Sequence, residues 1–276
     1  MISLISLAML ASANASSNAL DIAALIPTAT ATAPADAPLA AGALQNPAPP
    51  TAPPEPKWTG SVTAGAIVTT GNSQTRNANA TADAVYQRVK DRITLGFLWS
   101  YADNKNTPGA GWTLTDRKTS GRAKYDYFLS EKTYALAQAS AEADELADLD
   151  LRTTLGVGAG RQFADDEEWK FSAEGGLAHI DENHGSSPDD SYIAARAAYN
   201  ATWNLSKMWS FGQLVELYPS LESLDDFNAH VDTRAKATLT GSLFGQVQWV
   251  YDFDNTPATG HDRVDNRLIL TLGWKF

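Results

Sequence analysis

The chain has 276 residues, no cysteine, 43% hydrophobic residues and a formal net charge of -11 at pH 7. The lack of cysteine excludes disulfides and thiolate chemistry, and the negative charge argues against a nucleic-acid partner because phosphates would be repelled. No run of about 18 apolar residues follows the N-terminal region, which excludes membrane-spanning helices.

The N-terminal stretch MISLISLAMLASANA combines a short apolar core with small residues at Ala13 and Ala15. This pattern is typical of a signal peptide, so we expect export and removal of residues 1–15. Because the stretch lacks Lys and Arg, a disordered tail is the alternative. Residues 16–57 hold nine of the thirteen prolines and much alanine. We interpret them as an Ala/Pro-rich, flexible periplasmic linker.

From Trp58 onward, apolar and polar residues alternate with a period of two, and no segment has convincing helical periodicity. In residues 92–103, for example, Ile93, Leu95, Phe97 and Trp99 share one face. A two-residue period indicates a strand with one apolar and one polar face. The pattern predicts about twelve strands, over residues 58–69, 74–89, 92–103, 113–128, 133–144, 150–163, 169–181, 191–204, 209–219, 229–240, 243–253 and 264–276.

The connections between these segments alternate in length. Those after the second, fourth, sixth, eighth and tenth strands are short, such as VKD and SEK, whereas most of the others are long and polar, such as DNKNTPGAG. An even strand count with short turns at one end is typical of outer-membrane barrels. We therefore predict that residues 58–276 form a closed antiparallel transmembrane β-barrel in the outer membrane of a Gram-negative bacterium. The alternative is a soluble β-sandwich or closed barrel with an apolar interior.

Aromatic residues gather at the predicted strand ends, as in the aromatic girdles of membrane barrels. We expect them at the two lipid interfaces. The residues near the short-turn end are Trp58, Trp169, Trp203, Trp209, Trp274 and Phe276, and those near the opposite end are Trp99, Tyr101 and Trp112.

Several stretches resemble the YdiY-like family of outer-membrane proteins, a domain of unknown function sometimes labelled salt-induced. They are WTGSVTAGAIVTTGNSQT, KYDYFLSEKTYA, DLDLRTTLGVGAG, ELYPSLESLDDF and DNTPATGHDRVDNRLILTLGWKF. The resemblance extends from about Trp58 to Phe276 and implies the place and the fold, but no activity. The final Trp274-Lys275-Phe276 is similar to the signal by which such barrels are recognised for assembly. We therefore expect the barrel-assembly machinery and outer-membrane lipid as partners.

If the apolar residues face lipid, the residues between them line the interior. The predicted lumen-lining residues are Lys118, Arg122, Lys124, Asp126, Glu142, Asp144, Arg152, Glu174, Arg196, Glu216, Asp232, Arg234 and Arg267. These charges either line a polar lumen that passes small solutes or pair and plug the barrel. Gly156, Gly158 and Gly160 share the inward parity, so they either leave a gap for solvent or make room for long side chains from across the lumen.

The predicted outward loops are acidic, and their carboxylates could concentrate divalent cations or repel anions. No calcium-loop spacing is present, so we favour solvated loops and predict no metal site and no cofactor. The histidines at 179, 184, 230 and 261 lack a recognisable serine motif, so we expect no enzymatic activity. The hypothesis is a narrow passive channel for small hydrophilic or ionic solutes. The alternative is a non-conducting structural or interaction protein of the cell envelope.

Overall fold

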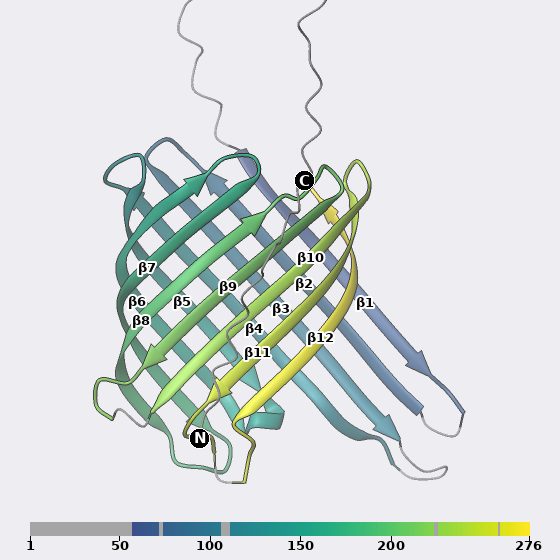
Figure 1. The fold of residues 1–276 in the computed structure, drawn as a ribbon. Helices are drawn as coiled ribbons and strands as arrows, with labels where there is room; N and C mark the ends of the chain where they lie inside the picture. Colours follow the sequence, from purple (N-terminus) through teal and green to yellow (C-terminus); the bar gives the residue numbers. More distant parts are fainter. Residues whose placement is uncertain (1–56, 72–73, 106–110, 224–225, 259) are drawn as a thin grey trace, which may run out of the picture. The chain divides into compact units, whose positions relative to one another are not determined.

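The computed structural model describes residues 57–71, 74–105, 111–223, 226–258 and 260–276. These residues form one closed antiparallel barrel in which each strand pairs with the next along the chain and β12 pairs with β1 (Figure 1). The predicted fold class is confirmed. The proposed signal peptide and nearly all of the proposed linker lie outside the described residues and stay predictions, while Lys57 is the first residue of β1.

The twelve strands of the described part lie close to the predicted segments, with ends that differ by at most three residues. They are β1 (Lys57–Thr69), β2 (Gln74–Gln87), β3 (Asp91–Lys105), β4 (Thr113–Phe128), β5 (Thr133–Asp144), β6 (Leu149–Asp165), β7 (Trp169–His184), β8 (Asp190–Trp203), β9 (Trp209–Pro219), β10 (Phe227–Thr240), β11 (Leu243–Asp254) and β12 (Val264–Lys275). One 3-10 helix, η1 (Glu145–Ala147), was not predicted, because a single turn is too short to produce a periodic pattern. No helix in these ranges is long and apolar enough to cross a membrane.

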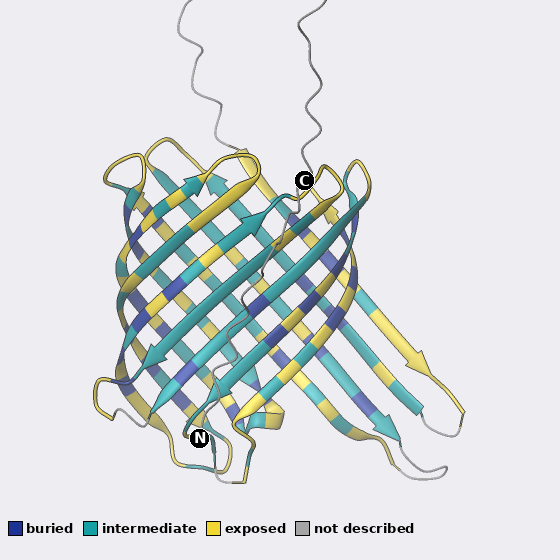
Figure 2. Ribbon diagram, viewed as in Figure 1, coloured by how far each residue is buried: buried dark blue, intermediate teal, exposed yellow. Residues whose placement is uncertain are grey.

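The outer surface of the barrel is apolar. On β12, Leu268, Leu270 and Leu272 are 69%, 55% and 60% exposed, and on β6 Leu155 and Val157 are 59% and 63% exposed. Figure 2 shows the matching alternation of exposed and covered residues along the strands. A continuous apolar surface of this kind is suited to lipid rather than water.

The interior is polar, which overturns the alternative of a soluble barrel with an apolar core. Lys118, Asp126 and Gln248 are nearly inaccessible to solvent, at 4%, 0% and 0% exposure. They come from strands β4 and β11, on which Tyr125, Tyr127, Val247 and Trp249 point the other way, although Phe244 and Val250 of β11 also lie inside. The polar and apolar faces of the predicted alternation are therefore inside and outside, respectively.

Aromatic side chains mark both ends of the apolar surface. The expected interface tryptophans are 37–55% exposed except Trp203, which is more covered and stacks on Trp169 with ring centroids 5.1 Å apart. At the other end, the Arg76 guanidinium lies 3.6 Å from the centroid of the Trp112 ring. Short turns and the C-terminus lie at the first end and the long loops at the second (Figure 1). These are the features of a barrel that spans the bacterial outer membrane.

Candidate solute pathway through the barrel

Charged side chains from opposite walls of the barrel meet in its interior. Lys118 Nζ on β4 lies 2.9 Å from Asp252 Oδ2 on β11, although these strands are not neighbours in the sheet. Arg234 Nη1 on β10 likewise lies 2.5 Å from Asp83 Oδ2 on β2, and its Nη2 lies 2.6 Å from Asp232 Oδ2. Such contacts are possible only if these side chains point inward.

Arg267 on β12 is the centre of one cluster near the long loops. Its Nε, Nη2 and Nη1 atoms lie 3.1, 2.5 and 3.2 Å from carboxylate oxygens of Asp116, Asp144 and Asp252. Lys118 also contacts Asp252, so the two cations share this carboxylate. The cluster joins four strands, β4, β5, β11 and β12, around the interior.

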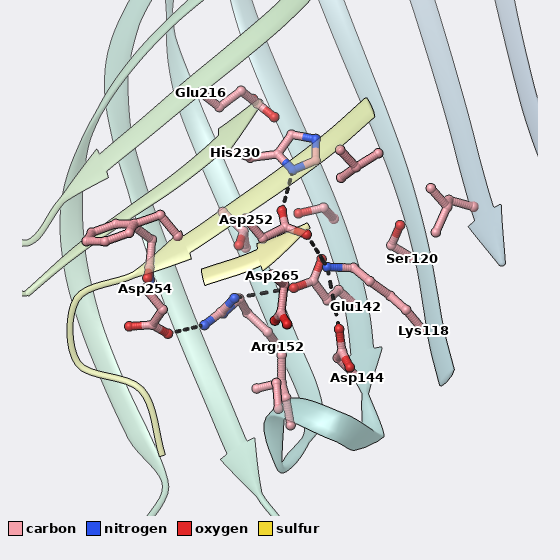
Figure 3. Close-up of a pocket in the computed structure, with 18 of the residues that line it drawn as sticks. Lys118, Ser120, Glu142, Asp144, Arg152, Glu216, His230, Asp252, Asp254 and Asp265 are labelled. Atoms are coloured by element: carbon pink, nitrogen blue, oxygen red, sulfur yellow. Dashed lines mark hydrogen bonds and ion pairs between the residues drawn. The ribbon is translucent and has the colours of Figure 1, made fainter. Parts of the chain in front are cut away.

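Arg152 on β6 forms a second cluster at the same end (Figure 3). Its guanidinium donates to Glu182, Glu142 and Asp254 at 2.7, 3.3 and 3.0 Å. His230 Nδ1 lies 2.6 Å from Asp252 Oδ1, which links this histidine to the Arg267 cluster. The sequence did not indicate this contact, because Asp252 lies on the neighbouring strand β11.

A third cluster lies nearer the short turns. Lys124 on β4 pairs with Glu174 on β7, across two intervening strands. Arg196 Nη1 and Nη2 lie 2.9 Å from Glu174 Oε2 and 2.7 Å from Glu216 Oε1. Asp126, also predicted to face inward, pairs with Arg92 at 2.7 Å. All thirteen predicted lumen residues thus have inward-facing contacts, and Arg122, whose Nη2 lies 3.8 Å from Asp83 Oδ1, also lines both interior cavities described next.

Two cavities lie one above the other inside the described barrel. The loop-side cavity has a volume of about 190 Å³ and reaches His261 and Asp262 in the loop after β11. The turn-side cavity has a volume of about 830 Å³ and reaches Lys90 and Glu131 in two short turns. From the middle of the barrel, the loop-side cavity extends toward the long loops and the turn-side cavity extends toward the short turns.

Four described residues line both cavities, and we call them the septum: Arg122, Ser140, Glu216 and Tyr218. The Tyr218 hydroxyl accepts a hydrogen bond of 3.0 Å from Gln138 Nε2 and donates one of 3.1 Å to Glu216 Oε1. Because Tyr218 is on β9 and Gln138 on β5, this hydrogen bond crosses the interior. The septum therefore separates the cavities through a small number of side chains.

The two cavities carry opposite charge. Counted over the described residues, the loop-side lining has nine carboxylates and five Lys or Arg, while the turn-side lining has six Lys or Arg and four carboxylates. A narrow cavity with low-dielectric walls concentrates ions of the opposite sign. The loop side therefore attracts cations and the turn side attracts anions.

The inward glycines of β6 make room for side chains of the neighbouring strand. A methyl group added to Gly160 would lie 2.4 Å from the Tyr134 ring, and one added to Gly156 would lie 2.9 Å from the Gln138 side chain. Tyr134 and Gln138 are both on β5, beside β6. The glycines thus leave no open gap at these two positions. The side chains that fill the space come from the neighbouring strand β5 rather than from across the lumen.

Sequence reasoning missed several interior residues. Three carboxylates form ion pairs with arginines that were predicted to line the lumen: Asp83 with Arg234, Asp116 with Arg267 and Glu182 with Arg152. Their parity agrees with that of the predicted set, so the alternation of β2, β4 and β7 held the signal. Tyr218 was missed because it is uncharged, and its neighbours Glu216 and Leu214 gave no sign that its hydroxyl crosses the lumen.

Asp148 organises the loop surface at the end of the loop-side cavity. Its carboxylate accepts hydrogen bonds from Ser186 N and Oγ, at 3.1 and 2.6 Å, and from Ser187 N at 3.1 Å. The Ser186 hydroxyl and amides hold the pKa of the Asp148 carboxyl below its ordinary value. Within the described ranges, no group of three or more acidic or histidine side chains is arranged to hold a metal ion. Solvated acidic loops, with divalent cations as the less favoured alternative, stay a prediction.

Comparison with known proteins adds the family and the architecture. Residues 62–276 match a family described as "Protein of unknown function, DUF481". No curated protein matches the chain in sequence. The prediction of an outer-membrane domain of unknown function is confirmed, while the narrower YdiY-like name stays a prediction.

Among solved structures, the chain is similar to the COG4313 outer membrane channel from Pseudomonas putida F1, with 15% identity, a TM-score of 0.47, and coverage of 84% of this chain and 99% of that one. It is also similar to the NanC porin, with 10% identity, a TM-score of 0.47, and coverage of 79% and 98%. At these values the likeness concerns the barrel architecture alone.

Proposed function

The chain belongs to the DUF481 family of proteins of unknown function, and from its own geometry we propose that it is a narrow passive channel for small hydrophilic or ionic solutes. The proposal includes no catalytic step and no cofactor. Outer-membrane lipid is the partner that its apolar exterior fits.

One observation carries the proposal, namely the two polar cavities that meet at the septum of Arg122, Ser140, Glu216 and Tyr218. A barrel filled by side chains throughout would leave no such volume, whereas larger barrels hold an aqueous channel. Here the obstruction between the two volumes is thin, and Arg122 keeps 37% of its side chain exposed. A small movement of Tyr218 or Arg122 would join the cavities.

The alternative, a non-conducting envelope protein, also has an observation in its favour. Arg267, Arg152 and Lys118 bind carboxylates from several walls and brace the loop-side half of the barrel. Such clusters narrow the path that a solute must take. The two functions therefore differ in whether the septum and the loop-side clusters leave room for hydrated ions.

We expect replacement of Tyr218 by alanine to raise single-channel conductance by at least about twofold, because the phenol ring and its hydrogen bond to Gln138 occupy the septum. The measurement is current through the refolded barrel in a planar bilayer. A second variant, Arg122→Glu, adds a negative charge at the same level and should shift ion selectivity toward cations.

The matched control is Tyr127→Ala on β4, because Tyr127 is 44% exposed on the outer face. Its conductance should equal that of the unmodified barrel. Each protein is first checked for folding by its heat-dependent migration in detergent gels. If folded wild-type and Tyr218→Ala barrels both stay silent, the channel proposal is wrong and the non-conducting alternative is favoured.

A further inference from the structure

The wall of the barrel is incomplete between its first and last strands. β1 pairs with β12 only from Ser61 to Ala64, opposite Lys275 to Leu272, and through Gly60 with Phe276. The same register would place Ala66 opposite Leu270 and Val68 opposite Leu268, but neither pair forms. β1 nevertheless continues to Thr69, paired with β2 along its whole length. We call the unpaired stretch between residues 65–69 and 266–271 the seam.

Beyond Gly65, β1 leaves the barrel wall. Residues 66–69 are exposed on both faces of the strand, including Ile67 at 53% and Val68 at 70%. Figure 1 shows the far end of β1 running away from β12, and Figure 2 shows that end as exposed. A strand that remained in the wall would have one covered face.

The seam lies at the level of the loop-side leaflet. β12 begins at Val264, after the long loop that follows β11, whereas Trp274 lies at the other interface, so the seam starts two residues from the loop end of the strand. The unpaired stretch from Leu270 toward Asn266 therefore opens onto the outer half of the apolar band. Open strand edges are unfavourable there, because hydrocarbon offers no hydrogen-bond partner.

A polar cavity of about 240 Å³ opens behind the seam. Its lining comes from β2, β3, β4, β12 and η1, including Asn77, Asn79, Ser100, Asp116 and Asn266. No residue of β1 lines it, although β1 stands between β2 and β12 in the sheet order. The cavity lies where β1 and β12 diverge.

Three buried polar atoms at this place lack a hydrogen-bond partner within the described part of the chain. They are Asn79 Oδ1, Ser100 Oγ and Thr271 Oγ1, on side chains of residues that are 9%, 4% and 7% exposed. Asn79 is paired with Ser100 across β2 and β3, and both Asn79 and Thr271 approach Gly65, where β1 departs. Buried polar groups normally find partners, so these atoms indicate a missing polar group.

We propose that the seam is a lateral binding portal for a bilayer amphiphile with one or more acyl chains and an uncharged, hydroxyl-bearing head. The head occupies the cavity beside Asn79 and Ser100, and a hydroxyl of the head hydrogen-bonds with Asn79 Oδ1 and Ser100 Oγ once these side chains rotate toward it. The chain lies outside, along Val68, Leu268 and Leu270. An uncharged head is favoured over an anionic one because Arg267, the cation at the cavity, is already bound by Asp116 and Asp144, and Asp265 adds a further carboxylate to the lining. The portal is independent of conduction along the barrel axis.

Closing the seam with a disulfide tests the proposal, and the chain contains no other cysteine. The Ala66→Cys/Leu270→Cys pair would join the strands at the first missing position of the register. The control pair, Ala64→Cys/Leu272→Cys, joins residues that already face each other and makes the same two substitutions, Ala to Cys and Leu to Cys. Binding of monoolein, a neutral amphiphile with two free hydroxyls, is measured by native mass spectrometry of the full-length protein from nanodiscs.

We expect saturable one-to-one binding of monoolein to wild type, at least tenfold weaker binding to the oxidised 66/270 pair, and recovery after reduction. The oxidised control pair should bind like wild type. No saturable binding to wild type, or equal binding to the oxidised 66/270 pair, would overturn the proposal.

A second variant decides the matter if the 66/270 pair does not cross-link. Asn79→Ala/Ser100→Ala removes the polar partners of the head and should weaken monoolein binding about tenfold. Asn200→Ala, in the turn-side cavity, is its matched control and should leave binding unchanged. Unaltered binding by the Asn79/Ser100 variant would overturn the proposal, whatever the conductance measurements show.

Discussion

At the scale of single residues, Asp148 has an unusual backbone conformation and its side chain joins two loops. Its φ of 57° places it in the left-handed region, which aspartate tolerates better than most residues because its short side chain bonds locally. From there the carboxylate receives the amides of Ser186 and Ser187, 38 and 39 residues away. One residue thus holds together the loop before β6 and the loop after β7.

We expect this contact to depend on pH. Because the folded pKa of Asp148 is lowered, the contact is fully present above the ordinary carboxyl pKa and is lost as pH falls through the lower, folded value. NMR titration of the Ser186 amide should give a midpoint below 3.8, the ordinary value. Asp148→Asn keeps the backbone conformation but should abolish the titration. A midpoint at or above 3.8 would contradict the assigned contact.

At the scale of elements, β5 and β6 pack by placing large side chains over glycines. Tyr134 is fully buried over Gly160, and its hydroxyl donates to Glu174 Oε1 at 2.8 Å. Glu174 in turn receives Arg196 and Lys124. The glycine therefore allows the tyrosine to reach the third ion cluster, and the β5–β6 pair supplies the frame of the turn-side cavity.

Gly160→Ala should lower the free energy of unfolding by about 1–3 kcal/mol, because the added methyl group would overlap the Tyr134 ring. The measurement is guanidinium unfolding of the refolded barrel in micelles, followed by tryptophan fluorescence. Gly245→Ala on β11 is the control, since an added methyl group there meets nothing within 4 Å. Equal stability of the two variants would show that Tyr134 does not depend on Gly160 for its position.

At the scale of the whole molecule, the interior ion clusters connect strands that are not neighbours in the sheet. Arg267 alone ties β12 to β4, β5 and β11, and its side chain is 11% exposed. Removing one member of a buried cluster leaves the remaining charges uncompensated. The barrel is therefore held by its strand ladder and also by contacts across its interior.

Arg267→Met, which keeps the length and removes the charge, should lower the free energy of unfolding by about 3 kcal/mol. Arg117→Met is the control, because its pair with Glu145 is exposed, at 55% and 54%, and should contribute nothing measurable. Guanidinium midpoints of the two variants give the comparison. A loss as small as that of Arg117→Met would mean that water in the lumen replaces the contacts of Arg267.

The sequence allowed the strands to be predicted because the two-residue alternation of β3, β11 and β12 records which face meets lipid. It also indicated the inward residues, since parity is a local property of a strand. It could not indicate which inward residues meet, because the contact between Lys118 and Asp252 spans 134 positions. The exit of β1 from the wall was equally hidden, since Ala66, Ile67 and Val68 read as an ordinary apolar continuation of the strand.

The opposite charges of the two cavities have a consequence for transport through the barrel. A negatively lined segment in series with a positively lined one is the ionic counterpart of a semiconductor junction, with mobile cations on one side and mobile anions on the other. When the loop side is positive, both kinds of carrier are driven toward the septum and fill it. When the polarity is reversed, both are drawn away and the septum is depleted. Under the proposed channel function, we expect such a barrel to rectify current, in a direction set by the orientation in which it is inserted.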